Sequence, residues 1–162
     1  MSRAQTTLDF AIGMSVFLGV VAFAFGFIPT MFAPFETETG TNAVIADRVG
    51  DRLVGDALAE EPTNPSILNG TCTASFFAGD SPGDCRYTTA DLHRATGVQS
   101  TVNLNVTVYD DSDIQTLDGV ELTRGPSPSS NDVVVARRIV SLPTHLGGGA
   151  TREAYRLEVK VW

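Results

Sequence analysis

The most pronounced pattern along the chain is an uninterrupted apolar segment near its N-terminus. Residues 10–35 contain no charged side chain, whereas residues 36–162 carry 18 acidic and 10 basic ones. The 19 residues from Phe10 to Ile28 would form a helix about 28 Å long, close to the ~30 Å hydrocarbon core of a bilayer. A helix in water would show a polar face, and this segment has none. We therefore predict a hydrophobic, membrane-spanning helix over residues 5–35.

A cleaved secretory signal peptide is the alternative for this segment. Its apolar region would be about 7–15 residues long and end at small residues, whereas Met31-Phe-Ala33 precedes a proline and contains bulky side chains. Pro29 and Pro34 are expected to end or kink the helix. Arg3 is the only charge before Asp9, and positive flanks stay in the cytoplasm, so residues 36 onward should lie outside the cell.

The apolar pattern changes to a helical period after a polar linker, which we place at residues 36–41. A helix is predicted over residues 42–60, with Asn42 as its N-cap and its charged side chains on the face away from the core. The expected core face consists of Val44, Ile45, Val49, Leu53, Val54 and Leu58.

From residue 101 onward the apolar pattern has a period of two, which is typical of half-buried strands. Strands are expected at residues 102–108, 114–123, 132–142 and 155–161, the second being the weakest. In the last strand Arg156, Glu158 and Lys160 are expected on the solvent face. Short polar links between consecutive strands favour an antiparallel sheet over residues 101–162, with the 42–60 helix packed on it. The predicted fold class is therefore α+β, with a single head domain over residues 42–162.

The two cysteines, Cys72 and Cys85, fall in residues 66–100, which we expect to be rich in loops. In an extracellular domain this pair predicts one structural disulfide, worth about 3 kcal/mol in the chain-entropy model. A metal centre would need more ligands at short spacing, and a redox pair would be a Cys-x-x-Cys motif. Neither pattern is present.

Composition narrows the class of partner. The formal charge of −8, without a cluster of basic residues, argues against nucleic acid as a partner.

The choice among charged residue types is also biased. Lys160 is the only lysine among 11 basic residues, and Asp outnumbers Glu by 12 to 7. An acidic, lysine-poor surface keeps proteins hydrated in concentrated salt. We therefore expect a halophilic source, the alternative being chance composition in an acidic extracellular domain.

Candidate chemistry in the head domain is limited to modification. Asn69-Gly-Thr71 and Asn105-Val-Thr107 match the N-glycosylation pattern, Asn69 in an expected loop and Asn105 in an expected strand. His93 and His145 are isolated, and we place both at the surface. The Asp110–Asp113 segment lacks the glycine and glutamate of a calcium loop. No paired nucleophile and base is recognisable, so we expect no enzyme, no cofactor, no metal and no small-molecule substrate.

Asp9 stands out because an acid next to an apolar span is costly unless paired. It could lie in the headgroup region and cap the helix N-terminus, or it could await a partner such as a free α-amino group. Arg3-Ala-Gln-Thr-Thr-Leu-Asp-Phe10, followed by the apolar segment, resembles the class III signal peptide of archaeal type IV pilins. Ala, Thr and Asp replace the commoner Gly, Ser and Glu of that motif, and Gly13 stands where Leu is frequent.

The resemblance covers about 30 residues at the N-terminus and implies a processing site. A prepilin peptidase would remove residues 1–4 by cutting between Ala4 and Gln5. Asp9 would then neutralise the α-amino group of Gln5 on a neighbouring subunit as helices stack into a filament, after storage in the membrane. The segment also resembles haloarchaeal pilin-like envelope proteins.

Two functions follow as expectations. The first is a pilin-like structural subunit of a cell-surface filament, anchored in the cell membrane before assembly, with adhesion as a further role and with self or homologous subunits as partners. The alternative is an uncleaved, single-pass envelope protein that acts as a binding or accessory module. A major pilin, a minor pilin and a non-polymerising protein all remain open.

Overall fold

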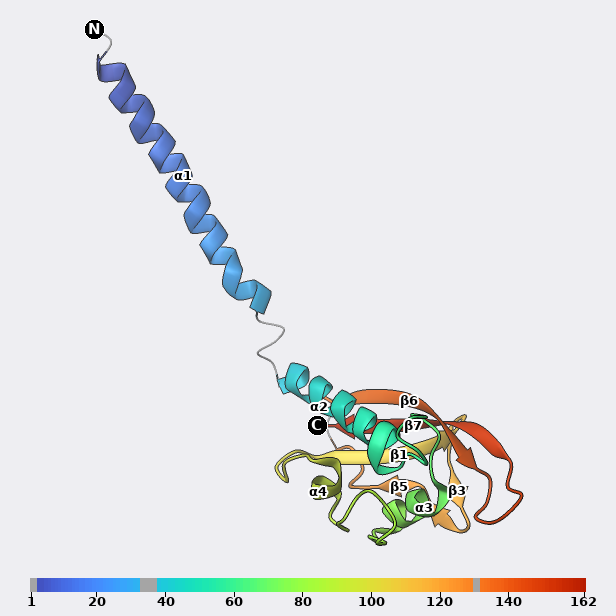
Figure 1. Cartoon of the computed structure of the whole chain (residues 1–162). Helices are drawn as coiled ribbons and strands as arrows, with labels where there is room; N and C mark the ends of the chain where they lie inside the picture. The colour runs from blue at the N-terminus through green and yellow to red at the C-terminus, as the bar shows by residue number, and fades with distance from the viewer. Residues whose placement is uncertain (1–2, 33–37, 130–131) are drawn as a thin grey trace. The chain divides into compact units, whose positions relative to one another are not determined.

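The computed structural model describes the backbone of residues 3–32, 38–129 and 132–162, and the side chains of residues 8–28, 40–129 and 132–162. The chain divides into two compact units, residues 1–40 and residues 41–162. Figure 1 shows the elements of each unit.

The first unit contains a single long helix, α1, from Arg3 to Phe32. Its segment Leu8–Ile28 has a mean hydropathy of 2.3, is long enough to cross a membrane and is not buried within the chain; a signal sequence near an N-terminus has the same properties. Pro29 was expected to end or kink the helix; it does not end it, because α1 continues to Phe32. Pro29 has no N–H to donate to the carbonyl four residues earlier, and the helix continues for only three residues beyond it. Pro34 lies outside the described residues.

Helix α2 (Glu38–Arg52) crosses the boundary into the second unit and is followed by a π-helical turn, η2 (Leu53–Ala57). Together, α2 and η2 form one continuous helical segment over residues 38–57. This segment begins four residues before the predicted start at residue 42 and ends three residues before the predicted end at residue 60. Residues 38–41 of the expected linker are therefore helical, and Asn42 is an interior residue rather than a cap; residues 36–37 lie outside the described part. Polar side chains do not end a helix by themselves, so the composition of this stretch was a poor guide to the boundary.

The segment 66–100 is more regular than predicted. It contains α3 (Gly70–Ala78) and α4 (Leu92–Thr96). Each begins at a side-chain cap, where Asn69 accepts from the N–H of Cys72 and Asp91 accepts from that of Arg94. Each also ends at a left-handed glycine, Gly79 or Gly97. These cap residues are the standard start and stop signals of helices, and they outweigh the loop-like composition between them.

The main sheet is antiparallel and confirms the predicted α+β class. Its order is β2-β1-β7-β6, and β5 also pairs with β1. The predicted single strand 114–123 is wrong: it comprises four two-residue strands, because Asp118 and Gly119 both adopt positive φ and turn the chain back on itself. The bounds are β1 Leu104–Asp110, β2 Asp113–Ile114, β3 Thr116–Leu117, β4 Val120–Glu121, β5 Thr123–Arg124, β6 Val134–Pro143 and β7 Arg152–Val161.

One face of this sheet forms the hydrophobic core together with α2 and α3. Alternate residues of β1 and β7, such as Val106 and Val159, are paired and fully buried. From α2, Val49 joins the same cluster, and from α3, Phe76 does so. Arg138 of β6 adds an edge contact by bonding the carboxylates of Asp47 and Asp51 on α2. The predicted packing of a helix on the sheet is thus present.

Candidate functional site: the N-terminal helix and the disulfide-linked region

Asp9 lies in the second turn of α1 and is exposed. Because the helix begins at Arg3, Asp9 is too far along it to cap the N-terminus of the chain as it stands. The side chains of Ala4 and Gln5 lie outside the described residues. Their backbone is helical, however, so residues 5 and 9 are separated by one turn and share a face of the helix.

The rest of α1 presents apolar side chains outward. Phe10 is 70% exposed and Phe23 is 69% exposed. The hydroxyl of Ser15 donates to the carbonyl of Ala11 at 2.8 Å, so this polar group is satisfied within the helix. In the described residues the only charged group of the span Leu8–Ile28 is Asp9. The surface suits lipid or another apolar helix.

The head unit contains the predicted disulfide between Cys72 and Cys85, with Cα atoms 5.6 Å apart. It ties the first turn of α3 to the segment that leads into Tyr87. The phenolic hydroxyl of Tyr87 donates to the carbonyl of Cys72 at 2.9 Å, and its ring meets Phe76 edge-on. Burial raises the pKa of Tyr87 to about 12, despite the nearby charge of Arg124. The phenol therefore stays protonated and keeps its hydrogen bond.

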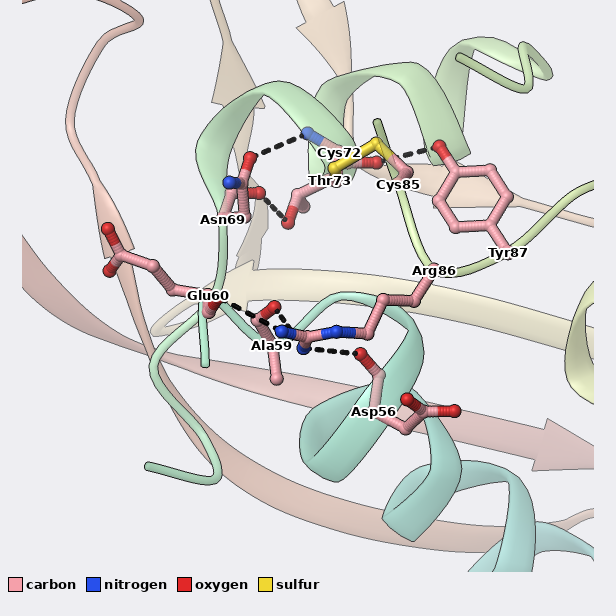
Figure 2. Close-up of a disulfide and its surroundings, with 9 residues drawn as sticks. All are labelled: Asp56, Ala59, Glu60, Asn69, Cys72, Thr73, Cys85, Arg86 and Tyr87. Atoms are coloured by element: carbon pink, nitrogen blue, oxygen red, sulfur yellow. Dashed lines mark hydrogen bonds between the residues drawn. A yellow bond between two sulfur atoms is a disulfide. The ribbon is translucent and has the colours of Figure 1, made fainter. Parts of the chain in front are cut away.

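Arg86, next to the disulfide, closes the C-terminal end of the α2–η2 helix. Its guanidinium donates to the carbonyl oxygens of Ala59 at 3.0 Å, Asp56 at 3.4 Å and Glu60 at 3.4 Å. Figure 2 shows the side chain reaching from the cysteine segment to these carbonyls. A cation is favourable at the negative end of a helix. No sequence signal separated Arg86 from the other arginines, so this contact was not predicted.

A second arginine, Arg124 of β5, also places its guanidinium against backbone carbonyls, here at the end of α3. It donates to the carbonyls of Phe76 and Ala90, and its guanidinium lies 4.8 Å from the centre of the Phe76 ring. Burial lowers its pKa from the usual arginine value. The contact joins α3 and the chain before α4 to the sheet.

On the outer face of the sheet, the expectation that Glu158 of β7 faces solvent is wrong. Glu158 is only 7% exposed rather than solvent-facing. It is held by Arg137 at 2.8 Å, Arg156 at 3.2 Å and Lys160 at 3.5 Å. Burial alone would raise the pKa of Glu158, but the hydrogen bond from Arg137 and the charges of the three cations outweigh it, so the pKa lies below the usual glutamate value. Arg156 and Lys160 flank Glu158 on β7 itself, whereas Arg137 is its cross-strand neighbour on β6, which a single strand pattern does not identify.

The two glycosylation candidates differ in their surroundings. Asn69 lies in a loop as expected, where it is half-buried and is the N-cap of α3. Asn105 is 5% exposed within β1. Of the two histidines, His145 is exposed as expected, whereas His93 is half-buried in α4 with its Nε2 atom 2.9 Å from the carbonyl of Val102. Among the residues whose placement is described, no group of three His, Cys, Asp or Glu side chains could hold a metal.

These features define a small disulfide-linked α+β domain that follows an exposed apolar helix. The chain belongs to a family of unknown function, DUF7287, whose sequence profile matches residues 1–162. No curated protein and no solved structure gives a significant match.

Proposed function

We propose that the protein is a pilin-like subunit of a cell-surface filament, trimmed between Ala4 and Gln5 by a prepilin peptidase. The helix α1 would hold the subunit in the cell membrane until assembly. The head, with its single disulfide and acidic composition, would face a saline medium, form the filament surface and take part in adhesion. An oxidising, extracellular setting is where such a disulfide persists.

The observation that carries this proposal is the placement of Asp9. In α1 it is the sole charged side chain of an otherwise apolar, exposed 21-residue span. It stands four residues after Gln5, so a cut before Gln5 would create an α-amino group one helical turn from an acid. In an apolar filament core, an acid and an amine on adjacent subunits would neutralise each other, whereas either one alone would be costly.

Processing is tested by the intact mass of the protein isolated from its native membranes. We expect loss of residues 1–4 and retention of all other residues. A full-length mass, apart from removal of Met1, would overturn the processing step. It would favour the second candidate, an uncleaved single-pass envelope module, which the membrane-length helix and the compact head also allow.

Assembly is tested with Asp9→Ala and the matched variant Asp9→Glu, each compared with the unsubstituted protein in sheared filament and membrane fractions. We expect Asp9→Ala to leave the protein in the membrane fraction and to reduce filament incorporation at least tenfold. Asp9→Glu keeps the charge and should retain most of the assembly. Normal filaments from Asp9→Ala would show that the charge pair is not needed.

A further inference from the structure

We propose that Asn69 carries an N-linked glycan on the folded head and that Asn105, the other Asn-x-Thr asparagine, does not. The inference rests on the proposed extracellular position of the head, since the modification takes place there. It does not depend on trimming at Gln5 or on filament assembly. The argument compares what each asparagine amide does in the folded domain, because a folded domain must accommodate any sugar it carries.

Asn105 has no room for a sugar. Its Nδ2 atom donates to the carbonyl of Gly125 at 3.2 Å, and its Oδ1 atom accepts from the hydroxyl of Thr107 at 2.8 Å. That hydroxyl lies 2.9 Å from the hydroxyl of Thr123 on the adjacent strand β5. Gly125 has a φ of 102°, and a Cβ atom there would stand 2.1 Å from the carbonyl oxygen of Leu104. The chain therefore passes directly over β1, and a sugar on Asn105 would force β5 away from it.

Asn69 uses its amide differently. Its Oδ1 atom accepts from the N–H of Cys72 at 3.0 Å and so caps α3, while its backbone carbonyl accepts from the hydroxyl of Thr73 at 2.7 Å. Figure 2 shows the Nδ2 atom on the side of the amide opposite the bond to Cys72. A bond from Nδ2 to a sugar leaves Oδ1 in place as the capping acceptor. Modification and capping are therefore compatible at this residue.

The space beside Asn69 is open and polar. Asn69 and Thr71 line a surface pocket of about 270 Å³, together with Glu60, His145 and Arg152. These side chains can exchange hydrogen bonds with sugar hydroxyls. The hydroxyl-bearing residue of the triplet, Thr71, is exposed. The middle residue must be small, because a Cβ on Gly70 would stand 2.6 Å from the ring of Pro143.

The chemical step is a glycosyl transfer from an oligosaccharide linked to a lipid phosphate. The Asn69 Nδ2 atom forms a bond to the anomeric carbon, and the bond from that carbon to the phosphate oxygen breaks. The lipid phosphate leaves with the bonding electron pair, and the amide nitrogen loses one proton. No oxidant or reductant is required, and the donor and the transferase are supplied outside this chain.

The first measurement is peptide mass mapping of the native protein after reduction and trypsin. Cleavage after arginine separates the two asparagines, since Asn69 falls in residues 53–86 and Asn105 in residues 95–124. We expect a sugar mass on the first peptide and none on the second. A sugar on residues 95–124, or no sugar on residues 53–86, would overturn the proposal.

Four variants separate the modification from the helix cap. Asn69→Asp keeps a capping oxygen but removes Nδ2, and should lose the sugar mass with little change in thermal stability beyond that due to the glycan. Thr71→Ala should lose the mass, whereas Thr71→Ser, which retains the hydroxyl, should keep it. Asn105→Asp should leave the mass unchanged. Retention of the sugar in Asn69→Asp, or its loss from Thr71→Ser, would contradict the assignment.

The same intact-mass spectrum keeps this proposal distinct from the proposed function. A protein trimmed before Gln5 without a sugar mass would overturn only the glycan. A glycosylated protein with residues 1–4 retained would overturn only the prepilin processing.

Discussion

The two units of the chain differ in how far their apolar side chains are exposed, as one phenylalanine from each unit shows. Phe17 in α1 is 60% exposed, whereas Phe76 in α3 is fully buried between aromatic rings and an arginine. The head unit closes a core of its own, with a disulfide and arginine contacts at its helix ends. The described part of α1 presents its apolar side chains outward. Helix α1 therefore has the length and surface of a membrane-spanning helix or of a signal sequence, whereas the head buries its apolar residues in a core of its own.

The difference between the exposed helix and the closed core predicts that the largest loss of stability follows substitution of Phe76. We expect Phe76→Ala to lower the free energy of unfolding of the head by about 3–5 kcal/mol, because it opens a cavity in the core and removes the ring under Arg124. Thermal or denaturant unfolding of the full chain in detergent measures this.

The matched control is Phe17→Ala in α1, which deletes the same side chain from an exposed position. We expect a change within about 0.5 kcal/mol in the same transition. A comparable loss in both variants would mean that the head depends on α1 for its stability.

The disulfide should give the next largest effect. Replacing both Cys72 and Cys85 by Ser is expected to cost about 3 kcal/mol, since the bond restricts a short loop in the unfolded chain. Unfolding with and without reductant measures it in the unsubstituted protein. A head whose unfolding temperature does not respond to reductant would show that the helix caps and core alone determine its stability.

Arg86 should contribute less than the disulfide to the free energy of unfolding, and its contribution should depend on whether the disulfide is present. We expect Arg86→Ala to cost about 1–3 kcal/mol because it removes the guanidinium donor from the carbonyls of Ala59 and Glu60, whereas the carbonyl of Asp56 keeps the N–H of Ala59. Exposed Arg94 is the control, and Arg94→Ala should be near neutral. In a double-mutant cycle with the disulfide, we expect a coupling of about 0.5 kcal/mol or more. Strict additivity would show that the disulfide does not position Arg86.

The smallest predicted effect is a pH dependence at Glu158. Its pKa is lower in the folded head than the usual value of 4.5. The stabilisation is therefore fully present above the unfolded-state pKa, and it is lost as the pH falls below 4.5 through the folded-state pKa. Unfolding temperatures should decline over this acid range, and Glu158→Gln should flatten the decline. An unchanged pH profile in Glu158→Gln would assign the acid sensitivity to other carboxylates.

The sequence was informative where one residue type repeated with a clear period. The apolar segment predicted α1, the alternation of Val and Leu predicted β1 and β7, and the cysteine pair predicted the disulfide. These signals are local, so they need no knowledge of what lies beside them.

The errors came from non-local contacts and from turn chemistry. Glu158 was placed in solvent because Arg137, its strongest partner, lies on β6, and only the pairing of β6 with β7 brings the two together. The strand 114–123 was assigned as continuous because the two-residue turn at Asp118 and Gly119 was missed. Helix α3 was missed although Asn69 and Gly79 mark its ends. The candidate site at Asp9 was recognisable because an acid beside an apolar span is rare.

The environment of Lys160 has a practical consequence for labelling. It is the only lysine in the sequence, its Nζ atom lies 2.7 Å from the Tyr109 hydroxyl, and its side chain is 19% exposed. An amine-reactive dye should therefore react slowly with the Lys160 amine while the head is folded and faster once the head unfolds. The single lysine thus reports chemically on whether the sheet around it is intact.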